Sequence, residues 1–93
     1  MLPIGEVESS YYLRLRVTDK PGVLADITRI LADCKISIEA MLQKEPAEGE
    51  SQVDIVMLTH RALEKDVGQA IARMEQLDSV AGSIVRLRME ELL

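Results

Sequence analysis

Residues 11–40 read YYLRLRVTDKPGVLADITRILADCKISIEA, and the rest of the fold can be predicted outward from this segment. Its first eight residues alternate between apolar and polar side chains, which is the two-residue period of a half-buried strand. The sequence Asp19-Lys20-Pro21-Gly22 then predicts a turn. Beyond the turn, apolar residues recur at helical spacing as far as Cys34, and alternation returns from Ile36 to about Gln43. The segment therefore predicts a strand, an amphipathic helix and a second strand.

The second half of the chain repeats this order. Residues 45–50, EPAEGE, predict a polar hairpin loop, and residues 52–59 are rich in β-branched residues, as strands are. A second helix follows, closed by turn-forming residues at 78–82, and residues 83–90 alternate again. The apolar stripe of that helix consists of Leu63, Val67, Ala70, Ile71, Met74 and Leu77. The order βαββαβ predicts an α+β, ferredoxin-like sandwich, with two helices on one face of a four-stranded antiparallel sheet of order 4-1-3-2.

This strand order makes two further predictions. The strand at 36–43 lies at an edge of the sheet, open to pairing with a second copy of the chain. The first and last strands are neighbours, so we expect four arginines to gather on the uncovered face of the sheet. They are Arg14, Arg16, Arg86 and Arg88. Carboxylates of a neighbouring domain or subunit are favoured over nucleic acid as their partners, with Asp54 and the glutamates as obvious candidates.

Composition narrows the class of protein. Ninety-three residues make one domain, and a hydrophobic content of 47% makes a single core plausible. The net charge of -5 and the absence of Phe and Trp disfavour nucleic-acid partners. No apolar run approaches the roughly 20 residues that span a bilayer, so we expect no membrane partner. The one cysteine cannot form an internal disulfide and no signal peptide is evident, which favours the cytoplasm.

A resemblance to a known family rests on three adjoining motifs. The run DKPGVLADI at 19–27, followed by Leu31 and by ISIEAM at 36–41, resembles the signature of ACT domains. More narrowly, YYLRLRV at 11–17 and QKE at 43–45 are similar to the C-terminal regulatory domains of bacterial homoserine dehydrogenases. The similarity covers roughly residues 8–92. Residues 1–10 contain Pro3 and Gly5 and show no sustained periodicity, which predicts a linker. The resemblance implies that this linker leads from a missing catalytic region and that residues 11–93 are the regulatory domain.

The same resemblance implies a function for the intact protein. Such an enzyme reduces aspartate semialdehyde to homoserine with NAD(P), and L-threonine is the expected feedback effector. The chain itself has no glycine-rich dinucleotide loop after a strand and no room for a dinucleotide-binding domain. We therefore expect neither catalytic residues, nor a metal, nor a bound cofactor within these residues. An ACT domain of another enzyme of amino-acid metabolism is the alternative host.

The first turn has the chemistry that an amino-acid effector needs. If the helix begins near Gly22, the N–H groups of Val23 and Leu24 are unpaired and favour a carboxylate. Asp19 can take the ammonium group, and Pro21 restrains the turn. The resemblance places the opposite wall of the site at Ile36, Ser37 and Ile38, often from another subunit. Many ACT domains have a glycine before this second strand and an asparagine at the position of Ser37.

Simpler interpretations remain open for several of these features. Pro-Gly before a helix is often a plain turn, and the domain could serve oligomerisation without a working effector site, an alternative that Lys35 and Ser37 support. An acylphosphatase-like enzyme would need an anion-cradling loop with an arginine, and an RNA-binding domain would need aromatic residues on the central strands. His60 has no second metal ligand at suitable spacing, so a surface role is favoured. Cys34 and the methionines at 41, 57, 74 and 89 are interpreted as core.

Overall fold

The central strand of the structure is β2 (Tyr11–Thr18), in which alternate residues from Tyr11 to Val17 are buried. This computed structural model describes residues 7–89. Strand β2 pairs antiparallel with β4 (Gln52–Thr59) on one side and with β6 (Val80–Arg88) on the other. Strand β3 (Ile38–Gln43) pairs with β4 and lies at the edge. The order β3-β4-β2-β6 is the order predicted from the sequence.

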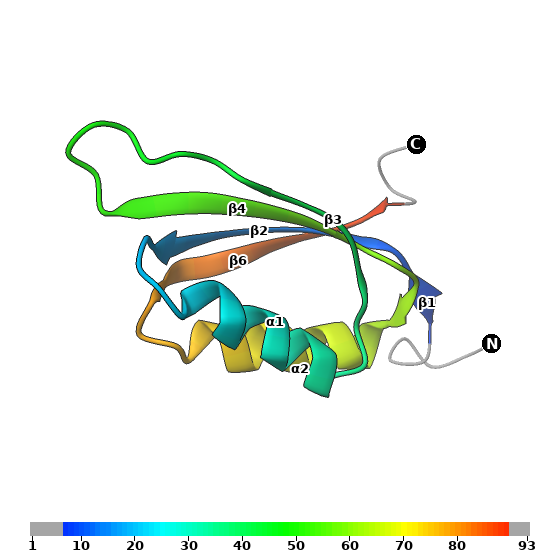
Figure 1. Cartoon of the computed structure of the whole chain (residues 1–93). Helices are drawn as coiled ribbons and strands as arrows, with labels where there is room; N and C mark the ends of the chain where they lie inside the picture. The colour runs from blue at the N-terminus through cyan, green and yellow to red at the C-terminus, as the bar shows by residue number, and fades with distance from the viewer. Residues whose placement is uncertain (1–6, 90–93) are drawn as a thin grey trace.

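Two helices cover one face of this sheet (Figure 1). They are α1 (Val23–Asp33) and α2 (Glu64–Glu75), and both are amphipathic. Their buried residues meet the buried sides of β2 and β4 in one continuous core. The α+β ferredoxin-like prediction is confirmed. This burial of apolar surface is the main stabilising term for a domain of this size.

The core contains most of the predicted apolar residues. Met57 and Met74 are fully buried and Cys34 is 7% exposed, as expected. Met41 is 42% exposed on the edge strand, so its assignment to the core was wrong. Because β3 has a neighbour on one side only among the described residues, its side chains are covered less than those of the inner strands.

The last strand begins earlier than predicted and contains a bulge. It starts at Val80 rather than at residue 83, and its register with β2 shifts between Arg14 and Arg16. Gly82 lies in this bulge with φ 69, a left-handed conformation that glycine adopts without strain. The N–H of Ile84 donates instead to Oε2 of Glu75 at 2.8 Å, so a helix side chain satisfies a group in the disrupted ladder.

The prediction of four arginines on one open face was wrong. Residues directly opposite each other in an antiparallel pair share a face of the sheet. Arg86 lies opposite the buried Leu13, so its side chain points to the side of the helices. There its guanidinium lies over Gly68 of α2, since a Cβ added to that glycine would be 3.8 Å from Nη1 of Arg86. Arg88 lies opposite the buried Tyr11 and has the same orientation. Arg14 and Arg16 point to the other side of the sheet, away from the helices.

A second, two-stranded sheet was not predicted. Strand β1 (Glu8–Ser9) pairs antiparallel with β5 (Ala62–Leu63), and the N–H of Glu64 donates to the carbonyl of Val7 at 3.0 Å. Ser9 is fully buried. Strands of two residues are too short to show a sequence period. Residues 7–9, assigned to a linker, therefore join the folded structure before the first long strand, whereas residues 1–6 of that linker lie outside the described part.

Candidate effector site

The turn between β2 and α1 is anchored by its backbone. The N–H of Thr18 donates to the carbonyl of Ser79, and that of Asp19 to the carbonyl of Ser51, both at 2.8 Å. Gly22 follows with φ 89 and precedes the first residue of α1. The carbonyl of Gly22 accepts the first helical hydrogen bond from the N–H of Asp26 at 3.0 Å. The helix therefore begins where the sequence predicted.

The first turn of α1 offers free hydrogen-bond donors. Helix geometry leaves the N–H groups from Gly22 to Ala25 without a partner in the helix, and no side chain of residues 7–89 caps them. A Cβ built at Gly22 would meet nothing within 4 Å, so the space before the turn is open. Asp19 and Pro21 are exposed beside this space. The turn can thus offer donors to a carboxylate and a carboxylate to an ammonium group.

The other predicted wall lies beyond the end of α1. Lys35 has φ 65, its N–H donates to the carbonyl of Ala32, and the N–H of Ile36 donates to that of Leu31. This is a Schellman motif, whose left-handed position is usually glycine. Ile36 is 5% exposed and belongs to the core. Its assignment as a wall of the site is therefore weakened within one chain.

The next two residues of that wall are more accessible. Ser37 is exposed, and its carbonyl accepts the N–H of His60 at 2.9 Å. Ile38 is half-buried and begins β3, two residues later than the predicted start of the strand. Because the Schellman motif takes residues 34–36 to close the helix, pairing with β4 starts only at Ile38. The hydroxyl of Ser37 remains available to a ligand approaching from outside.

The structure does not bring the two walls together within one chain. Helix α1 has 11 residues, which corresponds to a length of about 16 Å. Gly22 to Leu24 lie at its start and Ile36 to Ile38 follow its end, so the two groups lie at opposite ends of the helix (Figure 1). A free amino acid is too small to bridge that distance. The two predicted walls of the site therefore do not meet within one chain.

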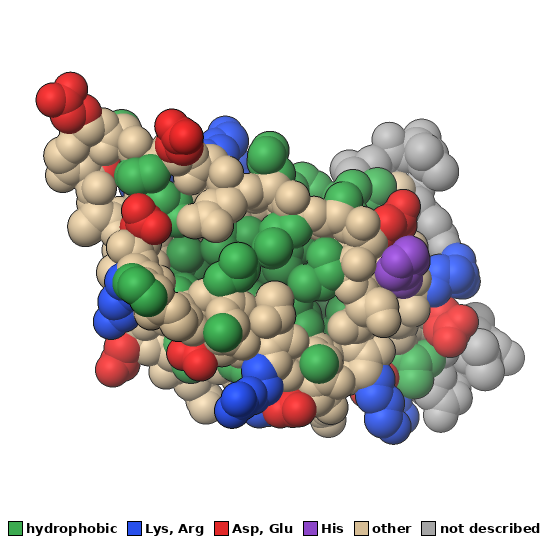
Figure 2. Space-filling view, in the orientation of Figure 1, with side chains coloured by type: hydrophobic (Ala, Val, Ile, Leu, Met, Phe, Trp, Pro, Cys, Tyr) green, Lys and Arg blue, Asp and Glu red, His purple; other side chains and the backbone are tan. Residues whose placement is uncertain are grey.

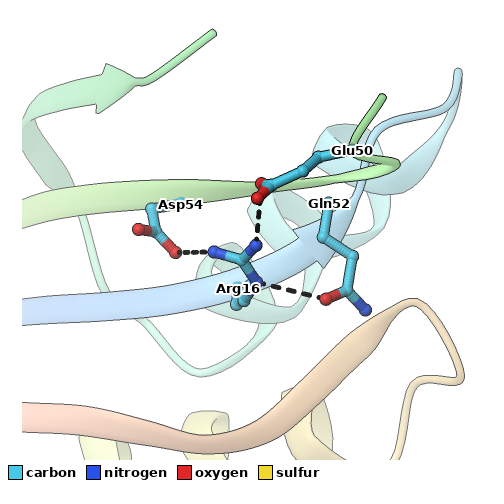
Figure 3. Close-up of polar contacts among 4 residues, drawn as sticks. All are labelled: Arg16, Glu50, Gln52 and Asp54. Atoms are coloured by element: carbon cyan, nitrogen blue, oxygen red, sulfur yellow. Dashed lines mark hydrogen bonds and ion pairs between the residues drawn. The ribbon is translucent and has the colours of Figure 1, made fainter. Parts of the chain in front are cut away.

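A polar cluster that the sequence indicated only in part lies next to the β2–α1 turn. The Arg16 guanidinium donates to Gln52 at 3.1 Å, to Asp54 at 3.2 Å and to Glu50 at 3.1 Å (Figure 3). Asp54 was an expected partner of the arginines, but the pair forms within one chain and not with a neighbouring domain or subunit. The cluster links β2 to the start of β4 and to Glu50 of the loop before it, and in that loop the carbonyl of Ser51 accepts the N–H of Asp19.

Other candidate groups carry no site of their own. Within residues 7–89 no cluster of three or more His, Cys, Asp or Glu could hold a metal. His60 is exposed, as predicted, and its Nδ1 lies 4.0 Å from Oε2 of Glu39. Cys34 is buried, with Nη1 of Arg73 3.9 Å from its sulfur. The described helices include none long and apolar enough to cross a membrane.

Comparison with known proteins identifies the class to which this fold and turn belong. The ACT domain family matches residues 11–79, and the chain is a member of that family. Over 92 residues it is 63% identical to homoserine dehydrogenase from Methylobacillus glycogenes, covering 99% of this chain and 22% of that protein. Homoserine dehydrogenase from Pseudomonas aeruginosa is 45% identical over the same length. The chain thus spans about a fifth of the length of these relatives.

Solved structures agree with this assignment. A homoserine dehydrogenase from Thiobacillus denitrificans matches with a TM-score of 0.83 and 60% identity, over 94% of this chain and 19% of that one. The ACT domain of a GTP pyrophosphokinase from Chlorobium tepidum matches with a TM-score of 0.68 at 12% identity, over 87% of this chain and 100% of that one. At that identity the second match shows the fold alone.

Proposed function

We propose that this chain is the regulatory domain of a homoserine dehydrogenase and that it binds a free amino acid, with L-threonine the leading candidate for feedback inhibition. The observation that carries the proposal is the uncapped start of α1, with open space in front of Gly22. Identity to homoserine dehydrogenases along almost the whole chain supports the choice of host. NAD(P) and the substrate then bind to the remaining part of the enzyme.

A second copy of the chain would complete the site. Strand β3 has a free edge among the described residues, and two such edges can pair antiparallel about a two-fold axis. Gln43 lies opposite Ile55 of β4, which lies opposite Leu15 of β2, so β3 ends on the side of the β2–α1 turn. Antiparallel pairing places the start of the partner's β3 beside that end. Ile36 to Ile38 of the partner subunit then face Gly22 to Leu24.

The surface beside this edge is suited to such an association. Met41 and Leu42 are 42% and 59% exposed on β3. Figure 2 shows apolar side chains gathered between the strands and helix α1, with charged side chains mainly around the margin. An exposed apolar patch with a charged rim is typical of protein interfaces. Self-association and effector binding would then be coupled.

An amide-detected NMR titration with L-threonine tests the proposal. We expect threonine-selective shifts at Gly22 to Leu24 and Ile36 to Ile38, with L-serine, L-isoleucine and L-methionine as controls. Gly22→Ala places a methyl group in the ligand space and should abolish the shifts. Gly49→Ala is the matched control, because Gly49 also has positive φ, 83, with nothing within 4 Å of a built Cβ. Each substitution should lower the folding stability by about 1–2 kcal/mol. A difference between the two variants in their response to threonine therefore reports on ligand binding and not on stability.

Two results would contradict this function. Equal threonine responses of the Gly22→Ala and Gly49→Ala variants would show that the β2–α1 turn does not contact the ligand. No threonine response at millimolar ligand, in either this chain or the full-length enzyme, would leave the second candidate, a domain that serves oligomerisation alone. The exposed edge of β3 is the observation that favours that candidate. Sedimentation equilibrium with and without threonine then separates the two, because a shared site predicts a stronger dimer with ligand.

A further inference from the structure

The face of the sheet opposite the helices carries apolar residues across all four strands. The register places Ala40, Leu58, Tyr12 and Leu87 side by side in one row, and Leu42, Val56, Arg14 and Val85 in the next. Leu42, Val85 and Leu87 are 59%, 44% and 38% exposed. We call these eight residues the open face. Antiparallel sheets with one solvated face usually carry polar residues there, so this face has the composition of a covered surface.

The alternation in β6 supports the same conclusion. On this strand the side chains that point away from the helices are Val85 and Leu87, whereas Arg86 points toward them. A strand with its outer face in water would show the reverse arrangement. The open face also contains two hollows. One of about 130 Å³ is lined by apolar residues including Leu42, Val56 and Leu58, and one of about 260 Å³ lies between Arg14 and the bulge.

Arg14 defines the charge that a partner must bring. It is exposed, and within residues 7–89 no ion pair neutralises it, whereas the neighbouring Arg16 is paired with Glu50 and Asp54. Covering an unpaired guanidinium is costly unless a carboxylate reaches it. A second copy packed on this face about a two-fold axis near Arg14 would bring the two guanidinium groups together. Charge therefore disfavours self-packing here and favours a partner with an acidic group.

We propose that the open face is the surface on which the rest of the longer polypeptide packs, presenting apolar side chains around one carboxylate that pairs with Arg14. The proposal rests on the proposed function, in which this chain is one domain of a homoserine dehydrogenase. The relatives carry more than three quarters of their length outside the matched segment, which supplies the partner. Through this contact the domain would transmit its state to the catalytic part.

Thiol labelling of Val85→Cys tests this contact. The variant is labelled with N-ethylmaleimide in this 93-residue chain, whose own Cys34 is buried, and in the full-length enzyme, and the unsubstituted form of each protein gives its background rate. Lys65→Cys is the matched control, because Lys65 is exposed on helix α2. We expect the introduced thiol at 85 to react at least about ten-fold more slowly in the full-length enzyme, and the thiol at 65 about equally in both. Adding Arg14→Glu should restore fast labelling at 85, because the introduced glutamate repels the carboxylate of the packing partner.

Each other outcome overturns part of the proposal. Equal labelling at 85 in both proteins removes the packing. Protection that appears in the 93-residue chain and grows with its concentration assigns the face to a second copy. If residue 85 stays protected in the Arg14→Glu variant, no carboxylate of the partner pairs with Arg14. Labelling needs no effector, so a failure of threonine binding leaves this test readable, and threonine binding without protection at 85 overturns the packing alone.

Discussion

Glu75 joins helix α2 to the bulge of β6, and its removal gives the sharpest stability test. Its Oε2 accepts the N–H of Ile84 at 2.8 Å, at the point where the β2–β6 ladder is interrupted. Ile84 is 8% exposed, so its N–H depends on this acceptor. Glu75→Ala removes the acceptor without disturbing the helix, because alanine is the best helix former.

The magnitude follows from two competing effects. A hydrogen bond to a charged group is worth about 1.5–3 kcal/mol, and a buried donor left unpaired costs a similar amount. Strand β6 lies at an edge of the sheet, so water can reach part of the vacated site and reduce the loss. We expect Glu75→Ala to lower the free energy of unfolding by about 1–2 kcal/mol, or the midpoint temperature by roughly 4–15 °C for a domain of this size.

Urea unfolding followed by circular dichroism measures this loss. Glu75→Gln keeps a side-chain oxygen and should retain most of the stability. Gln69→Ala, an exposed position on the same helix, should change it by less than about 0.5 kcal/mol. Hydrogen exchange should accelerate at the Ile84 amide in Glu75→Ala specifically. If Glu75→Ala and Gln69→Ala unfold alike and the Ile84 amide exchanges at its original rate, the bond does not support the bulge.

Three further substitutions probe the helix end, the core and the surface, each by the same urea unfolding. Lys35→Gly should raise the free energy of unfolding by about 0.5–1 kcal/mol, because φ 65 strains a residue with a Cβ more than it strains glycine; a loss would contradict the Schellman assignment. Met57→Ala should cost about 2–4 kcal/mol, since the side chain is fully buried, and a cost below that of an exposed substitution would refute its core position. Arg16→Gln should cost less than about 1 kcal/mol, because the guanidinium side chain is 41% exposed; a larger loss that persists at high salt would show a stronger network.

The parts of the fold that were predictable are those set by local periodicity. Residues 11–18 and 52–59 alternate cleanly because one side of each strand is buried in the core, and this alternation predicted the buried face of the sheet. The strand order was predicted from the βαββαβ succession of elements. The turn at 19–22 was predictable because proline and glycine have strong backbone preferences. These signals need no knowledge of what lies across the sheet.

The last strand shows where that reasoning fails. Alternation in residues 83–90 was recognised, but its apolar residues were grouped as if they faced the helices. In the structure Val85 and Leu87 face outward, and Arg86 extends over Gly68 of α2. Hydrophobicity identifies a covered face, and it does not say whether the cover comes from this chain. A strand that is apolar on its outer side therefore misleads a prediction made for one domain alone.

The effector site shows the same limit for function. The donors at Gly22 to Leu24 follow from the local start of a helix, and the wall at Ile36 to Ile38 follows from resemblance to the family. The predicted helix already implies about 16 Å between its two ends, so the information that the sequence lacks is which copy of the chain supplies the second wall. Under the proposed function, the two walls come together only when two copies of the chain associate.

A site divided between two copies has a thermodynamic consequence that a site within one chain lacks. If the effector contacts Gly22 to Leu24 of one copy and Ile36 to Ile38 of the other, it binds the dimer more tightly than the monomer. By linkage the effector then strengthens the dimer by the same factor, and dimerisation raises effector affinity. The open face lies on the same sheet as the edge strand β3, so strand pairing also sets the relative orientation of the two open faces. Under the proposed packing, a small ligand at the edge would thereby change how the two catalytic parts are arranged.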